Sequence, residues 1–152
     1  MKKILIFKFA LLVLISCSSV DDIAEKQREL NQARQLWQSQ QVENYKWNER
    51  LSCFCAGVLE WDLFVKDNLK EKVEFDEINL HQGQTYDDIL EKAKTVEEAF
   101  DFIETLLSKE IASLIIEYDD QYGFPTEVNI DFDFQIADDE TVYLYKGFEI
   151  IN

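Results

Sequence analysis

Histidine and methionine are almost absent from this chain of 152 residues, which contains one of each and three cysteines. Zinc, copper and haem sites draw most of their protein ligands from these residue types, so the composition argues against such centres. A Ser-His-Asp or Cys-His catalytic centre would have to use His81, which lies in the polar segment His81-Gln82-Gly83-Gln84. No nucleophile-elbow motif occurs in the sequence. We therefore expect a protein that is not an enzyme and that carries no cofactor.

Basic residues are also scarce, since 15 Lys and Arg stand against 31 Asp and Glu and give a formal net charge of −16 at pH 7. Nucleic acids and anionic lipid surfaces recruit basic patches, so we expect no nucleic-acid partner. The plainest interpretation of the acidic excess is that it keeps the protein soluble. The sharper interpretation is a cationic partner or a divalent metal ion.

A long apolar run is found only at the N-terminus. Lys2 and Lys3 precede the apolar segment Ile4 to Ile15, which is too short to span a bilayer because a spanning helix needs about 20 residues. The segment ends in Leu14-Ile15-Ser16-Cys17, which has the form of a bacterial lipobox. We predict a lipoprotein signal peptide over residues 1–16 and lipid attachment at Cys17. The alternative is a buried N-terminal helix.

The predicted lipid decides where the mature chain resides, because two or more acyl chains hold a protein stably on a membrane. Resemblance to Gram-negative lipoproteins adds that Ser18 after the cysteine favours the outer membrane. We therefore expect a lipid-anchored protein of the cell envelope that faces the periplasm. Residues 1–16 contain three lysines, Lys2, Lys3 and Lys8, and no acids. Their removal leaves 12 basic residues against 31 acids, a net charge of −19.

The mature chain is long enough for one domain whose core needs no disulfide framework. After a lipidated tether over residues 17–20, we predict a single domain over residues 21–152. Its first element is a helix from about Asp21 to Gln41 with a narrow apolar stripe, formed by Ile23, Leu30, Ala33 and Trp37. This stripe either packs against a sheet or binds a partner.

An alternation with period two then indicates strands. The first runs from Tyr45 to Cys55, and the face that we take as the core side carries Tyr45, Trp47, Leu51, Cys53 and Cys55, with Glu49 as the exception. A second strand covers residues 59–66. Asp67-Asn68 forms a two-residue turn into a third strand, which we expect to end near Ile78.

A capping box at Thr95-Val96-Glu97-Glu98 begins a helix that we expect to end near Lys109, after a short helical turn over residues 86–92. Three more strands are predicted over residues 113–118, 128–135 and 141–150. The order α-β-β-β-α-β-β-β predicts an α+β fold in which two main helices cover an antiparallel sheet.

Cys53 and Cys55 are the cysteines that the predicted lipid leaves free, and on the core side of the strand they would be buried. A disulfide is the default in an oxidising envelope. Residues i and i+2 of a regular strand have Cα atoms about 6.6 Å apart, near the upper limit for a disulfide. A bridge therefore requires the strand to bend, which Gly57 allows. Buried reduced thiols, a redox or metal role and an intermolecular bridge are the alternatives.

The acidic stretch after residue 130 is the candidate cation site, and it consists of Asp131, Asp133, Asp138, Asp139 and Glu140. As an EF-hand loop it fails, because Ile136 stands where glycine is required and Val142 where glutamate is expected. A cation site of another kind is one interpretation. The other is a solvated strand face followed by a turn in which Asp side chains cap backbone amides.

Two stretches resemble a known family. They are Ser52-Cys53-Phe54-Cys55, and Tyr122-Gly123-Phe124-Pro125 followed by Ala137-Asp138-Asp139-Glu140. Together they are similar to a family of small bacterial secreted proteins and lipoproteins known only as a domain of unknown function. The resemblance covers roughly residues 44–148 and implies an envelope location, a small α+β domain and no established activity. Family members often have proline after the second cysteine, where this chain has Ala56-Gly57.

From these patterns we predict an envelope lipoprotein that is a non-enzymatic binding or structural module with an envelope protein as its partner. The alternative is a divalent-metal-dependent factor or enzyme that uses the loop from Asp131 to Glu140.

Overall fold

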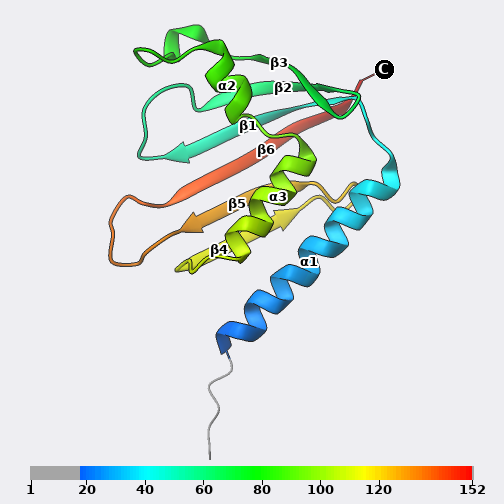
Figure 1. Cartoon of the computed structure of the whole chain (residues 1–152), viewed down its shortest axis with the longest axis vertical. Coiled ribbons are helices and arrows are strands. Elements are labelled where there is room, and N and C mark those ends of the chain that lie inside the picture. Colours follow the sequence, from blue (N-terminus) through cyan, green and yellow to red (C-terminus); the bar gives the residue numbers. More distant parts are fainter. Residues whose placement is uncertain (1–17, 152) are drawn as a thin grey trace, which may run out of the picture.

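The computed structural model describes residues 18–151, so the predicted leader and Cys17 lie outside the described residues. Six antiparallel strands form one sheet in the order β3-β2-β1-β6-β5-β4, and the helices pack against one face of it (Figure 1). The elements are α1 Ser18–Gln40, β1 Tyr45–Cys53, β2 Glu60–Lys66, β3 Leu69–Glu74, the 3-10 turn η1 Glu77–Asn79, α2 Tyr86–Lys92, α3 Val96–Leu107, β4 Ser113–Tyr118, β5 Pro125–Asp131 and β6 Thr141–Ile150. The predicted α+β class and antiparallel sheet are confirmed.

The centre of the sheet joins the first strand to the last one, since β1 pairs with β6 from Tyr45↔Ile150 to Cys53↔Thr141. On its other side β1 pairs with β2, and β2 continues through the predicted turn into β3. Asp67 and Asn68 both adopt left-handed backbone angles, with φ of 50° and 63°. Such angles are typical of tight hairpin turns and are tolerated best by Asn, Asp and Gly.

The core lies between the sheet and α3. The apolar face of α3 is fully packed and consists of Val96, Ala99, Phe100, Ile103, Leu106 and Leu107. Thr95 and Glu98 form the predicted capping box, in which each side chain accepts a hydrogen bond from the other residue's backbone amide. Helix α2 begins with a second capping box, between Thr85 and Asp88.

Three successive core-facing residues of β1 attach the first residue of α3 and the segment before it to the sheet. The hydroxyl of Tyr45 accepts a hydrogen bond from the amide of Val96 at 2.8 Å, and the indole of Trp47 donates to the carbonyl of Lys94 at 3.1 Å. Glu49 Oε2 accepts from the amide of Lys94 at 3.0 Å. These bonds fix where α3 begins over the sheet.

Helix α1 begins at Ser18, three residues before the predicted start, and packs beside α3. Leu30 and Trp37 of its apolar stripe are buried, whereas Ile23 is 48 % exposed. Arg34 forms ion pairs with Asp101 of α3 at 2.9 Å and with Glu104 at 3.3 Å. None of the helices within residues 18–151 combines the length and the apolar character that crossing a bilayer takes.

Besides β1, which ends at Cys53, the strands β3 and β5 end earlier than their alternation predicts. β5 ends at Asp131, so Phe132 and Phe134, which were expected within the strand, lie beyond it and are 45 % and 76 % exposed. The chain turns there because Asp133 accepts a hydrogen bond from the amide of Gln135 at 2.9 Å. β3 ends at Glu74, because Asp76 caps η1 in the same way. Both differences come from Asp side chains that compete with the strand for backbone amides.

Candidate functional site

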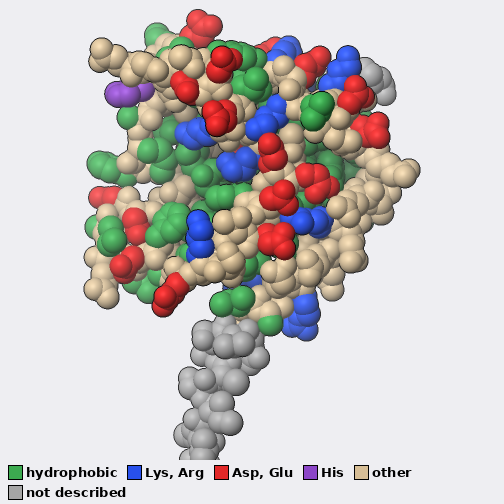
Figure 2. Space-filling view, viewed as in Figure 1, with side chains coloured by type: hydrophobic (Ala, Val, Ile, Leu, Met, Phe, Trp, Pro, Cys, Tyr) green, Lys and Arg blue, Asp and Glu red, His purple; other side chains and the backbone are tan. Residues whose placement is uncertain are grey.

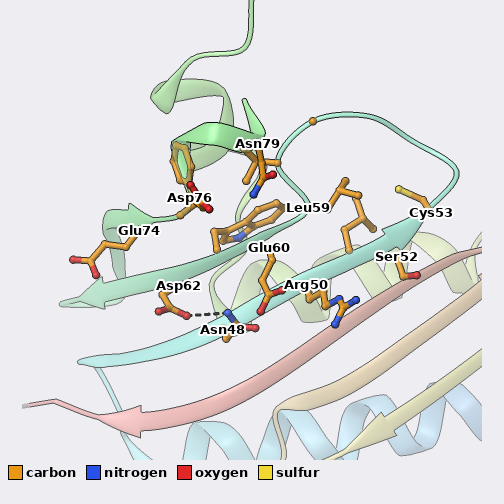
Figure 3. A pocket seen from close by; sticks show the side chains of 15 residues that line it. Asn48, Arg50, Ser52, Cys53, Leu59, Glu60, Asp62, Glu74, Asp76 and Asn79 are labelled. Atoms are coloured by element: carbon orange, nitrogen blue, oxygen red, sulfur yellow. Dashed lines mark hydrogen bonds between the residues drawn. The ribbon is translucent and has the colours of Figure 1, made fainter. Parts of the chain in front are cut away.

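A pocket of about 540 Å³ opens where β1 ends and β2 begins (Figure 3). Side chains on alternate positions of β1 and β2 form its floor, and the segment from β3 into η1 forms the opposite wall. Its polar lining comprises Asn48, Arg50, Ser52, Glu60, Asp62, Glu74, Asp76 and Asn79. The pocket therefore joins one cation and several carboxylates from three strands and a loop.

Strand register explains why these groups meet. β1 and β2 pair so that Asn48 lies opposite Asp62 and Arg50 lies opposite Glu60. The Asn48 amide donates a hydrogen bond to Asp62 Oδ1 at 2.9 Å, which holds both side chains in place. Arg50 is exposed and takes part in none of the ion pairs found within residues 18–151. Its guanidinium is therefore available to a ligand that offers oxygen acceptors.

The chain between β1 and β2 also lines the pocket, and the side chain of Gln84 holds it in place. Its Oε1 accepts hydrogen bonds from the amides of Val58 and His81, each at 3.2 Å. Gly57 has a φ of 109°, and a Cβ at this position would lie only 2.7 Å from the same Gln84 oxygen. The positive φ favours glycine at residue 57, and a Cβ there would also require the end of the Gln84 side chain to move.

Beneath the pocket lies a carboxylate that is fully buried, that of Glu49. Its Oε2 accepts from the indole of Trp61, a residue that lines the pocket, and from the amide of Lys94, both at 3.0 Å. The Lys94 ammonium lies 3.5 Å from Oε1. Burial raises the pKa of the Glu49 carboxyl, and the charge of Lys94 opposes this shift. Glu49 is the exception that the sequence pattern left unexplained on the core side of β1.

This buried centre has a structural role in the fold. It accepts two hydrogen bonds from groups that would otherwise be buried without an acceptor, and such unsatisfied groups cost about 1–3 kcal/mol each. Burial also raises the pKa of Tyr145, with the Glu49 charge adding to the effect. In a sequence, an acidic residue at a core-side position of an alternating strand is the pattern that could predict a buried, hydrogen-bonded carboxylate of this kind.

The two cysteines for which a disulfide was predicted are adjacent to the pocket. Cys53 and Cys55 are joined by a disulfide, with Cα atoms 5.2 Å apart, and Cys53 lines the pocket. The prediction that both lie buried on the core side is wrong, because Cys55 is exposed and Cys53 is partly exposed. β1 ends at Cys53 and the chain bends at Phe54, so the alternation that defined the core side does not reach Cys55.

Asp131 is the last residue of β5, the other predicted acidic residues lie in the β5–β6 loop, and none of them lines the pocket. Asp139 accepts a hydrogen bond from the amide of Asp133 at 3.0 Å, which makes it a loop cap. The shielded Oδ1 atoms of Asp131 and Asp139 have no hydrogen-bond partner. Loss of hydration, followed by the charges of Asp139 and Glu140, raises the pKa of Asp131. No group of three or more His, Cys, Asp or Glu within residues 18–151 is arranged to hold a metal ion.

Acidic side chains are scattered over the face that carries the helices, with lysines and arginines between them (Figure 2). A family model described as a family of unknown function, DUF6174, matches residues 29–150. The match confirms the expected likeness to a domain of unknown function. Neither a curated protein nor a solved structure matches the chain.

Proposed function

The chain belongs to DUF6174, a family of unknown function, and we propose that it acts as a non-enzymatic binding module in the bacterial cell envelope. In this proposal the leader over residues 1–16 is removed and a lipid on Cys17 holds the domain, most suitably on the outer membrane. The lipobox sequence at residues 14–17 supports the anchor. The acidic charge supports a partner that presents cationic groups.

The observation that carries the binding role is the polar pocket at the end of β1 and β2. Its carboxylates come from Glu60, Asp62, Glu74 and Asp76, and Arg50 adds one cation among them. Neighbouring carboxylates and a guanidinium suit recognition of a ligand with both amino groups and oxygen acceptors, as on the surface of a protein. The pocket is about 540 Å³, within the range of small-ligand sites.

Site-specific photo-crosslinking in intact cells tests this role. A photoreactive residue at Ser52, which is exposed in the pocket, is expected to give a defined adduct. The same residue at Thr105, exposed on α3 away from the pocket, is the matched control. The substitutions Arg50→Ala and Asp62→Asn should reduce the Ser52 adduct several-fold. Equal adducts from both positions, or none from Ser52, would contradict binding at the pocket.

A second candidate, a divalent-metal-dependent factor, rests on the β5–β6 loop. The Oδ1 atoms of Asp131 and Asp139 lack hydrogen-bond partners and are shielded from solvent, which is an arrangement that a cation would stabilise. Calorimetry with calcium, on a soluble form of residues 18–152, should then show heat and a raised melting temperature that Asp131→Asn removes. An absence of response at millimolar calcium would eliminate this candidate.

A further inference from the structure

Strand β4 leaves one side of its backbone unpaired, because it is an edge of the sheet and pairs with β5 alone among the strands of residues 18–151. The amide of Ala112, one residue before the strand, donates to the carbonyl of Phe132 beside β5. Hydrogen bonding alternates along an antiparallel pair, so Leu114 and Ile116 also bond towards β5. Ser113, Ile115 and Glu117 therefore direct their N–H and C=O groups to the open edge.

The opposite edge of the sheet is protected, whereas β4 is not. β3 reads Leu-Lys-Glu-Lys-Val-Glu, and its four charges are a common means of preventing strand addition. The hydroxyl of Tyr86 on α2 also accepts the amide of Val73 at 3.0 Å, so α2 covers that edge. β4 reads Ser-Leu-Ile-Ile-Glu-Tyr, with one charge and no proline, and Ile115 is 53 % exposed.

Helix α1 encloses space beside this open edge. It packs against α3 and runs past β4, outside the outline of the sheet (Figure 1). Three adjoining cavities of about 250, 200 and 390 Å³ follow one another between α1 and β4. Ile115 lines the first two of them and Ile116 lines the second and third. Together they form one groove, which we call the α1–β4 groove, and it runs the length of the strand.

The charge of the groove identifies its occupant. Its carboxylates belong to Asp22, Glu25, Glu29, Asp119 and Asp120. The cations that line it are Lys26, which is paired with Asp22, and Lys109. A second copy of this acidic chain would bring the same carboxylates to the same edge and would be repelled. A basic segment would be attracted.

We propose that the α1–β4 groove binds an extended, basic segment of a partner protein, which adds to the sheet as a seventh strand beside β4. Main-chain hydrogen bonds to Ser113, Ile115 and Glu117 supply the pairing. Branched apolar side chains of the segment pack between α1 and Ile116, and its lysines or arginines face Glu25 and Glu29. The groove lies at the β4 edge of the sheet and shares no residue with the pocket on β1 and β2, so this inference does not depend on what the pocket binds.

Hydrogen exchange on the purified full-length chain tests the pairing. The probe is a capped decapeptide of alternating lysine and valine. Bound as a strand, it should slow exchange at the amides of Ser113, Ile115 and Glu117 at least tenfold, because these amides otherwise face solvent. The same peptide with every backbone amide N-methylated keeps its charge and cannot pair, so it should give no protection. A glutamate–valine peptide should not bind.

Two sets of variants locate the effect. Ile115→Pro removes an amide that faces the open edge and leaves the ladder to β5 intact, so it should abolish protection. Ile115→Val is its control and should bind normally. Should Ile115→Pro fail to fold, the double substitution Glu25→Gln with Glu29→Gln replaces it, since it should weaken peptide binding at least several-fold at low salt. Three results would each overturn the proposal: equal protection by the N-methylated peptide, binding unchanged in Ile115→Pro or in the Glu25→Gln, Glu29→Gln double variant, or a dimer in sedimentation with the same amides protected.

Discussion

At the scale of single residues, the Glu49 side chain is the one on which we base the first predictions about stability. Its carboxylate occupies a position on β1 where alternation places an apolar residue, and it is fully buried. It accepts hydrogen bonds from two separate parts of the chain, Trp61 on β2 and Lys94 before α3. Replacement by leucine would leave both donors buried without acceptors, at a cost of about 1–3 kcal/mol each.

Glu49 should also give the stability of the protein a recognisable pH dependence. Its pKa is raised in the folded state, so the folded protein holds a proton that the unfolded chain releases above its ordinary pKa of about 4.5. The stabilisation from Glu49 is therefore fully present below pH 4.5 and falls as the pH rises through the raised pKa. Glu49→Gln keeps an acceptor for Trp61 and removes the titration. Its stability relative to wild type should rise between pH 4 and pH 7 in urea unfolding.

The control for this measurement is Glu110→Gln, which removes one exposed acid outside the core. Its stability difference from wild type should change little over the same range. Curves for Glu49→Gln and wild type that stay parallel from pH 4 to pH 7 would show that Glu49 does not titrate differently in the two states.

The cysteine pair is the second prediction at this scale. A ring closed over three residues removes little freedom from the unfolded chain, so the chain-entropy contribution is about 1.6 kcal/mol. Replacing Cys53 and Cys55 together by alanine should therefore lower the free energy of unfolding by about 1–2 kcal/mol in urea titrations. Alkylation and mass spectrometry should find no free thiol before reduction. A pair that cycles at about −120 to −270 mV, as in oxidoreductases, would instead indicate a redox role.

At the scale of elements, the placement of α1 depends on the β4–β5 turn. Gly123 lies in that turn with a φ of 84°, and a Cβ there would overlap the Ala33 carbonyl oxygen of α1 and lie 3.0 Å from Leu36 Cβ. The helix can approach the turn because residue 123 has no side chain. The same contact sets the width of the α1–β4 groove at this end, since Gly123 lines its largest cavity.

Gly123→Ala should therefore destabilise the protein by about 3 kcal/mol or more, because the overlap with backbone adds to the strain of the left-handed conformation. Gly83→Ala is the matched control, since Gly83 has a similar φ of 86° and open space around its Cα. It should cost about 1 kcal/mol, the strain alone. Thermal unfolding of both variants measures the difference, and equal losses would show that α1 yields to the added methyl group.

At the scale of the whole molecule, the predicted lipid anchor at Cys17 determines where the domain resides. Cys17→Ser should prevent lipidation and leave an unprocessed precursor, or a form that is not extracted with membranes. Fractionation of cell envelopes, with Ser18→Ala as the matched control, measures this. Co-fractionation of the Cys17→Ser variant with the outer membrane, as for wild type, would refute the lipobox interpretation.

The whole fold was largely accessible from the sequence because local signals agreed with each other. The capping box at Thr95, the turn at Asp67-Asn68 and the alternation in β1 and β2 each act over a few residues, and each is present in the structure. The ends of the strands were harder to predict from the sequence. Asp76 and Asp133 cap turns with their side chains, and the apolar residues around them, such as Ile78 and Phe134, gave a misleading continuation of the strands.

The sequence by itself determined the α+β class, most of the elements and the acidic character of this protein, because these depend on spacing and composition along the chain. Only the tertiary structure decided that β1 pairs with β6, that Glu49 meets Lys94 and that α1 overhangs the β4 edge. The physical reason is that these contacts join residues far apart in the chain. No local pattern encodes such a contact, which forms when buried polar groups and apolar faces find partners across the completed sheet.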